Sequence, residues 1–164
     1  MPREAAVVGS PIGDLEVVVE SGAVVAIRFD ATAPGTAGPS ADPVLGAAVA
    51  QLAEYFAGRR RGFDLPLRPA GTAFRQRVWA ELATIPWGTT TTYGAIAARL
   101  GLPPGASRAV GAANGANPIP VVLPCHRVVG SDGTLTGYAG GLDRKATLLR
   151  LEHVATAADQ DALF

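Results

Sequence analysis

One cysteine and one histidine stand side by side in this chain, and their chemistry is the most distinctive in the sequence. The segment VVLPCHRVVGSDGTLTGYAGG, residues 121–141, holds the only cysteine, Cys125, followed directly by His126. A lone cysteine is most often a small buried hydrophobic group. A proline before it and a histidine after it favour a positioned nucleophile instead, because an imidazole lowers the pKa of a thiol and accepts its proton.

The same residues speak against a metal or cofactor site. One cysteine and two histidines without a CxxC pair fall short of the four ligands of a structural zinc site, and no motif marks a cofactor. Adjacent side chains do not easily meet face to face, so we expect His126 to reach the sulfur through a water molecule. A carboxylate on the far side of the ring would fix the tautomer of the imidazole. Spacing alone does not select it from the acids downstream.

Composition and charge limit the classes of protein to which the chain can belong. The chain has 164 residues, 48% of them hydrophobic, with no apolar run long enough to span a bilayer and no signal peptide pattern. A single cysteine excludes an internal disulfide and favours the cytoplasm. The net charge is zero, but residues 72–154 carry eight basic against four acidic residues. That segment is suited to an anionic partner, although a solvated basic face is the commoner explanation of such an excess.

The first part of the chain predicts a β-rich lobe with one helix. Residues 5–29 contain apolar β-branched runs broken by the turn segments SPIGD and ESG, as in antiparallel strands. Residues 31–43 are rich in Gly, Pro and Ala and are expected to form a surface loop. Asp42 and Pro43 then begin a helix that Gly58 ends. Its expected inward face consists of Leu45, Val49, Leu52 and Phe56.

The second part predicts three helices, two of them in a helix-turn-helix pattern. Thr72 caps the first, with Phe74, Val78 and Leu82 inward. Residues 92–101 and the segment SRAVGAANGAN, residues 107–117, form two short helices around the turn LPPGA. An ordinary helical hairpin gives the same pattern. The last helix has almost no side-chain bulk apart from Arg108 near its start, where residues that read a DNA groove stand.

The motifs of this second part resemble a known family. NPIPVVLPCHRVVGSDGTLTGYAGGLDRKATLLRLE is similar to the active-site signature of the O6-alkylguanine-DNA alkyltransferases, the methylated-DNA–protein-cysteine methyltransferases. The resemblance continues upstream through FRQRVWAELATIPWGTTTTYGAIAARLG and SRAVGAANGANP and covers residues 72–153. It implies DNA repair in a single turnover, in which an alkyl group moves from a flipped-out O6-alkylguanine to the protein. O4-alkylthymine is a second candidate substrate.

The resemblance also implies a role for each candidate site residue. Cys125 accepts the alkyl group, His126 is the base that acts through water, and Glu152 orients His126. The remaining roles concern DNA and the alkyl group. Asn117 braces the cysteine loop, Arg108 enters the base stack, Tyr93 faces the phosphate and guanine N3, and Tyr138, Ala139 and Gly140 line the pocket for the alkyl group.

The predicted fold class is α/β in the α+β arrangement. Residues 1–71 form a small antiparallel β-sheet lobe with a helix, residues 72–155 form a helical catalytic lobe with a winged helix-turn-helix-like motif, and residues 156–164 form a tail. The expected partner is double-stranded DNA carrying O6-alkylguanine. We expect no cofactor, no metal and no membrane, and a cytoplasmic monomer whose cooperativity on DNA stays open.

Two other classes remain as alternatives. A non-catalytic protein that binds alkylated DNA would lack the acceptor thiol, which Cys125 supplies. A cysteine hydrolase would place its cysteine and histidine on separate elements, would need an oxyanion hole, and would turn over.

Overall fold

The computed structural model describes residues 3–31 and 42–155. The chain divides into two compact units, one made of residues 1–70 with 118–122 and the other of residues 71–117 with 123–164. The sequence places a lobe boundary after residue 71; the structure in addition groups residues 118–122 with the first unit. Most of the loop expected at residues 31–43 and all of the tail expected at 156–164 lie outside the described residues.

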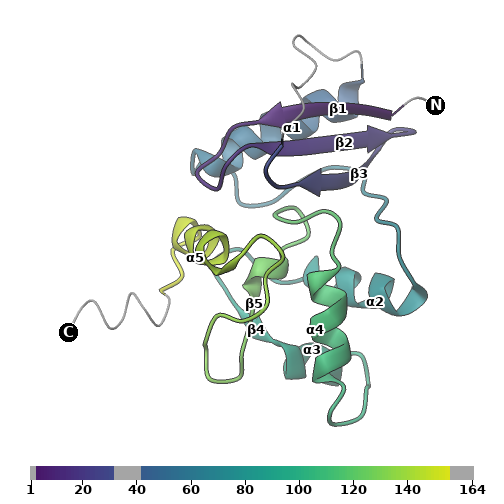
Figure 1. Ribbon diagram of the computed structural model, residues 1–164, viewed down its shortest axis with the longest axis vertical. Helices are drawn as coiled ribbons and strands as arrows, with labels where there is room; N and C mark the ends of the chain where they lie inside the picture. The colour runs from purple at the N-terminus through teal and green to yellow at the C-terminus, as the bar shows by residue number, and fades with distance from the viewer. Residues whose placement is uncertain (1–2, 32–41, 156–164) are drawn as a thin grey trace. The chain divides into compact units, whose positions relative to one another are not determined.

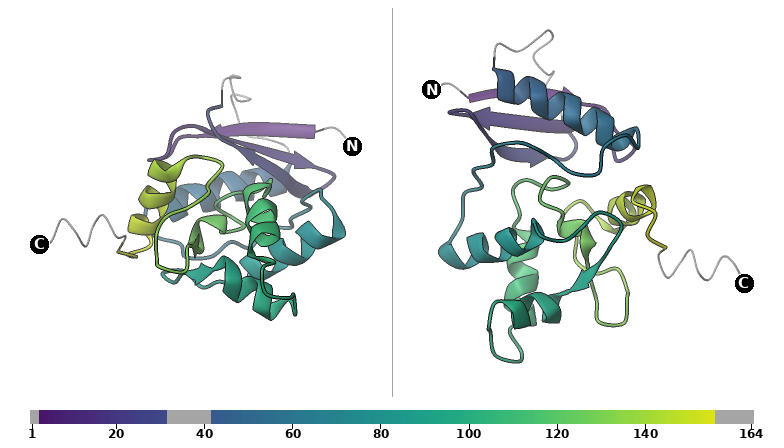
Figure 2. Two further views of the ribbon diagram at one scale, coloured as in Figure 1. Left: turned by 60° about the horizontal axis from the view of Figure 1, so that its bottom comes forward. Right: turned by 180° about the vertical axis from the view of Figure 1, so that it is seen from behind.

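The first unit is an antiparallel sheet with a helix on one face. Its strands are β1 (Arg3–Val8), β2 (Leu15–Glu20) and β3 (Ala23–Arg28), paired in the order β1-β2-β3. Helix α1 (Pro43–Phe56) packs along the sheet, as Figures 1 and 2 show. The central strand β2 buries the side chains of Leu15, Val17 and Val19. The β-branched runs of the sequence thus form the predicted strands.

Helix α1 begins as predicted, and two of the four residues expected on its inward face are buried. The Asp42 carboxylate accepts a hydrogen bond from the Val44 amide at 2.8 Å, and Pro43 occupies the first helical position. The buried residues are Leu45, Ala48, Leu52 and Tyr55. Leu45 and Leu52 are thus confirmed, whereas Val49 and Phe56 are only half-buried. Small Ala48 lets the helix approach the sheet, and the large Tyr55 ring fills the far end, where its centroid lies 5.3 Å from that of Phe63.

The second unit is mainly helical. Its elements are α2 (Ala73–Leu82), α3 (Tyr93–Arg99), α4 (Ser107–Gly115), the 3₁₀ turn η1 (Cys125–Arg127) and α5 (Leu142–Leu151). Thr72 and Thr92 cap α2 and α3 with their hydroxyl groups, as predicted. Helices α3 and α4 pack against each other, and α2 packs on α4 (Figure 1). The predicted helix-turn-helix is therefore present.

A short strand pair was not foreseen. Strand β4 (Thr91–Thr92) pairs in parallel with β5 (Val128–Val129). This pairing joins the start of α3 to the end of the cysteine turn η1. Two-residue strands carry no periodicity that a sequence pattern can reveal. The pairing fixes where η1 lies relative to the helix-turn-helix.

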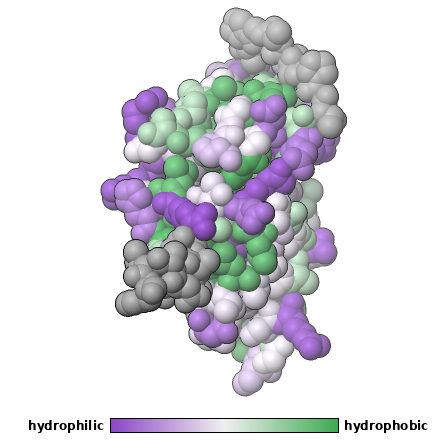
Figure 3. Space-filling model, turned by 60° about the vertical axis from the view of Figure 1, so that its left-hand side comes forward, coloured by the Kyte–Doolittle hydropathy of each residue, from purple (hydrophilic) through white to green (hydrophobic). Residues whose placement is uncertain are grey.

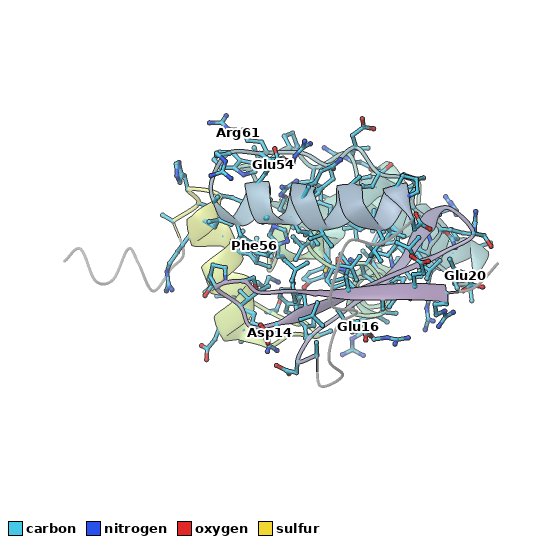
Figure 4. All side chains as sticks on the ribbon, turned by 90° about the horizontal axis from the view of Figure 1, so that it is seen from above. Asp14, Glu16, Glu20, Glu54, Phe56 and Arg61 are labelled. Carbon is cyan, nitrogen blue, oxygen red and sulfur yellow. The ribbon has the colours of Figure 1, made fainter. Side chains whose placement is uncertain are left out.

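The surface is mixed in character. On the face that Figure 3 shows, hydrophilic side chains are interspersed with apolar ones. On the first unit, Asp14, Glu16 and Glu20 lie on the side of the sheet, and Glu54 and Arg61 lie on the side of α1 (Figure 4). Within the described residues, no helix is long and apolar enough to cross a membrane.

Candidate active site around Cys125

The cysteine lies in a tight turn held by backbone hydrogen bonds. Its amide donates to the Leu123 carbonyl at 2.8 Å, and the Arg127 amide donates to the Pro124 carbonyl at 3.0 Å. The side chain is only 5% exposed, and the thiol is free. Proline at position 124 suits this turn because its fixed φ removes freedom that the loop would otherwise lose on folding.

Two asparagines tie the turn to the end of α4. The Asn117 amide donates to the Leu123 carbonyl at 2.8 Å, and the same side chain hydrogen-bonds the Cys125 thiol. The Asn114 amide lies 3.4 Å from the Cys125 carbonyl, a weaker contact. Asn117 thus lies where the sequence expected a brace, and Asn114, which sequence reasoning passed over, is a second link from α4.

The surroundings of the thiol keep it protonated at neutral pH. Burial raises the pKa of Cys125 to about 11, against the smaller opposing effects of the Asn117 hydrogen bond and the nearby Lys145 ammonium. Burial in turn lowers the pKa of Lys145 to about 8. A thiol with such a pKa is a weak nucleophile until a base removes its proton.

The base expected beside the thiol is fully buried and bound to the expected carboxylate. The His126 Nε2 atom lies 2.8 Å from Glu152 Oε2, and neither side chain has any exposed surface. Glu152 follows the last residue of α5, so the end of this helix delivers the carboxylate to the ring. Burial lowers the pKa of His126, and the Glu152 interaction opposes this effect. The resting imidazole is therefore neutral at neutral pH.

The tautomer of His126 follows from this contact. An ionised carboxylate only accepts hydrogen bonds, so Nε2 must carry the hydrogen. The other ring nitrogen, Nδ1, is buried and accepts no hydrogen bond from a described residue. A bare nitrogen on the residue next to the thiol can accept a proton, directly or through water.

Arg127 completes this cluster. Its Nε donates to Glu152 Oε1 at 2.8 Å and its Nη2 to Oε2 at 2.9 Å, while Nη1 donates to the Ile85 carbonyl at 2.6 Å. From the sequence, Arg127 is expected to tie loops together, and these hydrogen bonds join it to Glu152 and to Ile85. Its signal was a charge between apolar neighbours, which indicates burial with a partner.

A second group of hydrogen bonds involves the loop before α5. The Tyr93 hydroxyl donates to the Thr136 carbonyl at 3.1 Å, and the Lys145 ammonium donates to the same carbonyl at 2.5 Å. Tyr93 thus lies beside the loop that was expected to line the pocket. Lys145 is buried, which the sequence did not predict for the only lysine of the chain.

The three expected pocket residues follow in this loop. Tyr138 is half-buried, and burial, together with the nearby Cys125, raises the pKa of its hydroxyl. Ala139 is exposed and Gly140 half-buried. The Gly140 carbonyl accepts a hydrogen bond from Arg144 at 3.1 Å, which anchors the loop to α5.

Arg108 is not part of the buried cluster. It is the second residue of α4 and is exposed, as are Ser107, Ala109 and Ala112 of the same helix. The Gly111 backbone passes close to the Tyr93 ring, since a Cβ built there would lie 3.8 Å from Tyr93 Cδ1. The expected DNA-contacting residues thus lie on α3 and α4, and the reactive residues lie on η1 and at the end of α5.

Comparison with known protein families agrees with this arrangement. Residues 73–154 match the family model of the 6-O-methylguanine DNA methyltransferase, DNA binding domain, and residues 5–69 match that of its ribonuclease-like domain. The chain belongs to the O6-methylguanine DNA methyltransferase family. Members of this family repair DNA by transferring an alkyl group to cysteine, and this chain is a DNA repair methyltransferase of that kind.

Several relatives resemble the chain over most of its length. A methylated-DNA–protein-cysteine methyltransferase of Mycolicibacterium paratuberculosis is 51% identical over 148 residues, which cover 88% of this chain and 89% of the relative. The crystal structure of the Mycobacterium tuberculosis O6-methylguanine methyltransferase superposes with a TM-score of 0.82 at 44% identity, covering 99% of this chain and 100% of that one.

A structure of the Mycobacterium tuberculosis OGT in complex with DNA is also similar. Its TM-score is 0.81 at 45% identity, over 95% of this chain and 96% of that one. The methyltransferase family thus accounts for both units of the fold, and its DNA-binding domain model covers Cys125, His126 and Glu152.

Proposed function

We propose that Cys125 is the residue that accepts the alkyl group, and that it does so once. The thiol proton moves through a water molecule to Nδ1 of His126. The sulfur then attacks the alkyl carbon bonded to O6 of guanine, and a carbon–sulfur bond forms as the carbon–oxygen bond breaks. The electron pair of the broken bond stays with the base, which takes up a proton at N1 to become guanine, while the His126 imidazolium returns its extra proton to water. The carbon–sulfur bond of the thioether on Cys125 is not broken by water or by thiols, so the protein is consumed.

The observation that carries this proposal is the hydrogen bond between His126 Nε2 and Glu152 Oε2. This contact orients the neutral His126 ring and leaves its Nδ1 available to accept a proton. His126 directly follows Cys125, which carries the thiol. When that nitrogen takes the proton, Glu152 stabilises the imidazolium that results. Because the pKa of Cys125 is about 11 at rest, we infer that the sulfur becomes a nucleophile only as this transfer occurs.

For the DNA, we propose binding from the minor groove with the damaged nucleotide flipped out. The alkyl carbon on O6 cannot be reached inside a duplex. Exposed α4 carries small residues on either side of Arg108, so its backbone can approach a groove closely. Arg108 would occupy the gap in the base stack, and the Tyr93 hydroxyl would turn from Thr136 toward guanine N3 and donate a hydrogen bond.

The loop residues complete the proposed site. Tyr138, Ala139 and Gly140 would line the space for the alkyl group, and Asn117 would keep the cysteine turn in place. O6-alkylguanine in double-stranded DNA is the proposed substrate, with O4-alkylthymine as the second candidate. We propose that the protein acts as a cytoplasmic monomer and that the lobe of residues 72–155 carries both DNA binding and chemistry.

Intact-mass measurement after mixing with equimolar O6-methylguanine duplex tests the proposal. We expect a gain of one methyl group, located on the Cys125 peptide, and no further product when more substrate is added. The Cys125→Ser variant is the matched control and should keep binding the duplex without gaining mass. Binding without transfer by the unaltered protein would favour a non-catalytic binder, and repeated turnover would favour a hydrolase.

A further inference from the structure

Arg127 and Glu152 form a buried bidentate pair next to the reactive histidine. The guanidinium makes two parallel hydrogen bonds to the carboxylate, at 2.8 and 2.9 Å. The Arg127 side chain is 7% exposed and that of Glu152 is fully buried. Oxygen Oε2 of Glu152 is shared, because it contacts both Arg127 Nη2 and His126 Nε2.

The shared oxygen fixes how many protons the histidine and glutamate hold. An arginine remains protonated in proteins, so the guanidinium compensates the carboxylate in full. The His126–Glu152 pair therefore needs only the one proton that lies on Nε2. The Arg127 charge also opposes a second proton on the ring and so contributes to the lowered pKa of His126.

We propose that Arg127 is a positioning residue that keeps Nδ1 of His126 free of a proton. This inference rests on the proposed role of His126 as the base. Without the guanidinium, the buried carboxylate would be uncompensated, and such a charge takes up a proton from solvent. The pair would then hold two protons, either as imidazolium and carboxylate or as an Nδ1–H imidazole and a carboxylic acid. Both of these arrangements place a hydrogen on Nδ1, whereas a carboxylic acid that still accepts from Nε2–H would leave Nδ1 bare and would contradict the inference.

The other ionisable groups near the ring cannot replace Arg127. Lys145 of α5 also lowers the pKa of His126, but its ammonium donates to the Thr136 carbonyl and not to Glu152. Cys125 is a thiol at rest, and Tyr138, whose hydroxyl pKa burial raises, is neutral. Arg127, in contrast, binds both carboxylate oxygens of Glu152.

Nitrogen chemical shifts of the His126 ring test the inference without any repair reaction. In the unaltered protein we expect hydrogen on Nε2 alone between pH 6 and 8. Arg127→Met removes the charge and keeps much of the volume, and it should place a hydrogen on Nδ1 at pH 7. Arg127→Lys keeps the charge and should restore the bare Nδ1. Both variants lose the guanidinium hydrogen bond to the Ile85 carbonyl, so a comparison of the two isolates the effect of the charge.

The pH profile of single-turnover methyl transfer is the second readout. Because a neighbouring charge shifts a pKa by roughly 1–3 units, the acid limb in Arg127→Met should rise by about one unit or more. In Arg127→Lys it should stay near that of the unaltered protein. Equal losses in both variants with unmoved limbs would make Arg127 only a structural tie to Ile85.

Two further results would overturn the inference. The first is an Nδ1–H ring in the unaltered protein, which needs no variant. The second is a bare Nδ1 in folded Arg127→Met. If Arg127→Met does not fold, the ring of Arg127→Lys decides, because an Nδ1–H ring there contradicts the inference. Absence of methylation of Cys125 would instead count against the proposed function, and the tautomer measurement would be unaffected by it.

Discussion

Arginine–glutamate pairs occur in both units of this protein, in contrasting surroundings. On the sheet of the first unit, Arg3 contacts Glu20 at 2.8 Å, with side chains that are 56% and 39% exposed. In the second unit, Arg127 contacts Glu152 at the same distance, with side chains that are 7% and 0% exposed. The hydrogen-bond lengths are the same, so the difference between the pairs lies in the solvent.

This contrast determines what each pair can do. Water and ions screen the surface pair, and ordering two long side chains offsets most of what remains. The buried pair has no such screening, so either partner left alone is an uncompensated charge in the interior. The exposed pair Arg3–Glu20 therefore contributes little, whereas the buried pair Arg127–Glu152 sets the protonation state of the neighbouring His126.

The largest effect is expected from Glu152→Gln, which breaks the buried pair. Methyl transfer should slow by about 10²–10⁴-fold, the usual range for a positioned acid–base group. The free energy of unfolding should fall by roughly 3–5 kcal/mol, because Arg127 is left buried without its counter-charge. Single-turnover kinetics and urea denaturation measure the two losses.

Duplex binding separates the two roles of Glu152. At a temperature where the Glu152→Gln variant stays folded, its affinity for undamaged duplex should equal that of the unaltered protein. A loss of affinity as large as the loss of rate would show that Glu152 supports the DNA-binding helices and not the histidine.

Arg108→Ala tests whether an exposed arginine can affect repair as strongly as the buried pair does. Arg108 is exposed, so its removal should leave stability within error. If it replaces the stacking of the flipped base, worth a few kcal/mol, repair in duplex DNA should slow by about 10²-fold, while reaction with a free O6-alkylated guanine base should be unchanged. Equal losses on both substrates would assign Arg108 to the fold.

The pH dependence of stability should distinguish the buried groups of the second unit from surface charges. The pKa of Cys125 is raised to about 11, so the folded state keeps a proton that the unfolded state loses, and this contribution to stability declines as pH rises toward 11. The pKa of Lys145 is lowered to about 8, so its contribution rises between pH 8 and the value of an unfolded lysine.

Cys125→Ala removes the contribution to stability that declines as pH rises. Relative to the unaltered protein, it should become more stable with each pH unit between about 8.5 and 11, by at most about 1.4 kcal/mol per unit. Thermal denaturation of both proteins across this range measures the difference. A constant difference would mean that the thiol titrates alike in the folded and unfolded states.

The smallest effect is expected from Glu20→Gln on the sheet. The hydrogen bond from Arg3, together with its charge, holds the pKa of Glu20 below its usual value, but the pair is exposed. We expect a melting temperature within error of the unaltered protein and no change in methyl transfer. A clear loss of stability that persists in high salt would show that the surface pair resembles the buried one more than its exposure indicates.

The start of each capped helix could be predicted well from the sequence, whereas the residues that the helices bury could be predicted less well. The caps Asp42, Thr72 and Thr92 were readable because a capping hydroxyl or carboxylate acts within three residues. Two of the four residues expected on the buried face of α1 were misplaced because Ala48 and Tyr55 carry weaker hydrophobic signals than the neighbouring Val49 and Phe56. Local rules act over a turn of helix, whereas burial depends on the whole fold.

The candidate site divides in the same way. The pairing of Cys125 with His126 was visible in the sequence, but Glu152 came only from the family resemblance, since 25 residues separate it from His126. The bidentate contact of Arg127 and the burial of Lys145 depend on where α5 packs against η1. No spacing in the sequence encodes that packing.

The grouping of residues 118–122 with the first unit bears on how the chain is made. The Pro118 carbonyl accepts a hydrogen bond from the Ile27 amide, and Ile119 and Val121 are buried. During synthesis, the first unit therefore lacks residues 118–122 until α4 has been made, because this segment follows α4 in the chain. That segment ends three residues before Cys125. A chain truncated before residue 118 would lack both the last piece of the first unit and the acceptor cysteine, so incomplete products of this kind carry no thiol.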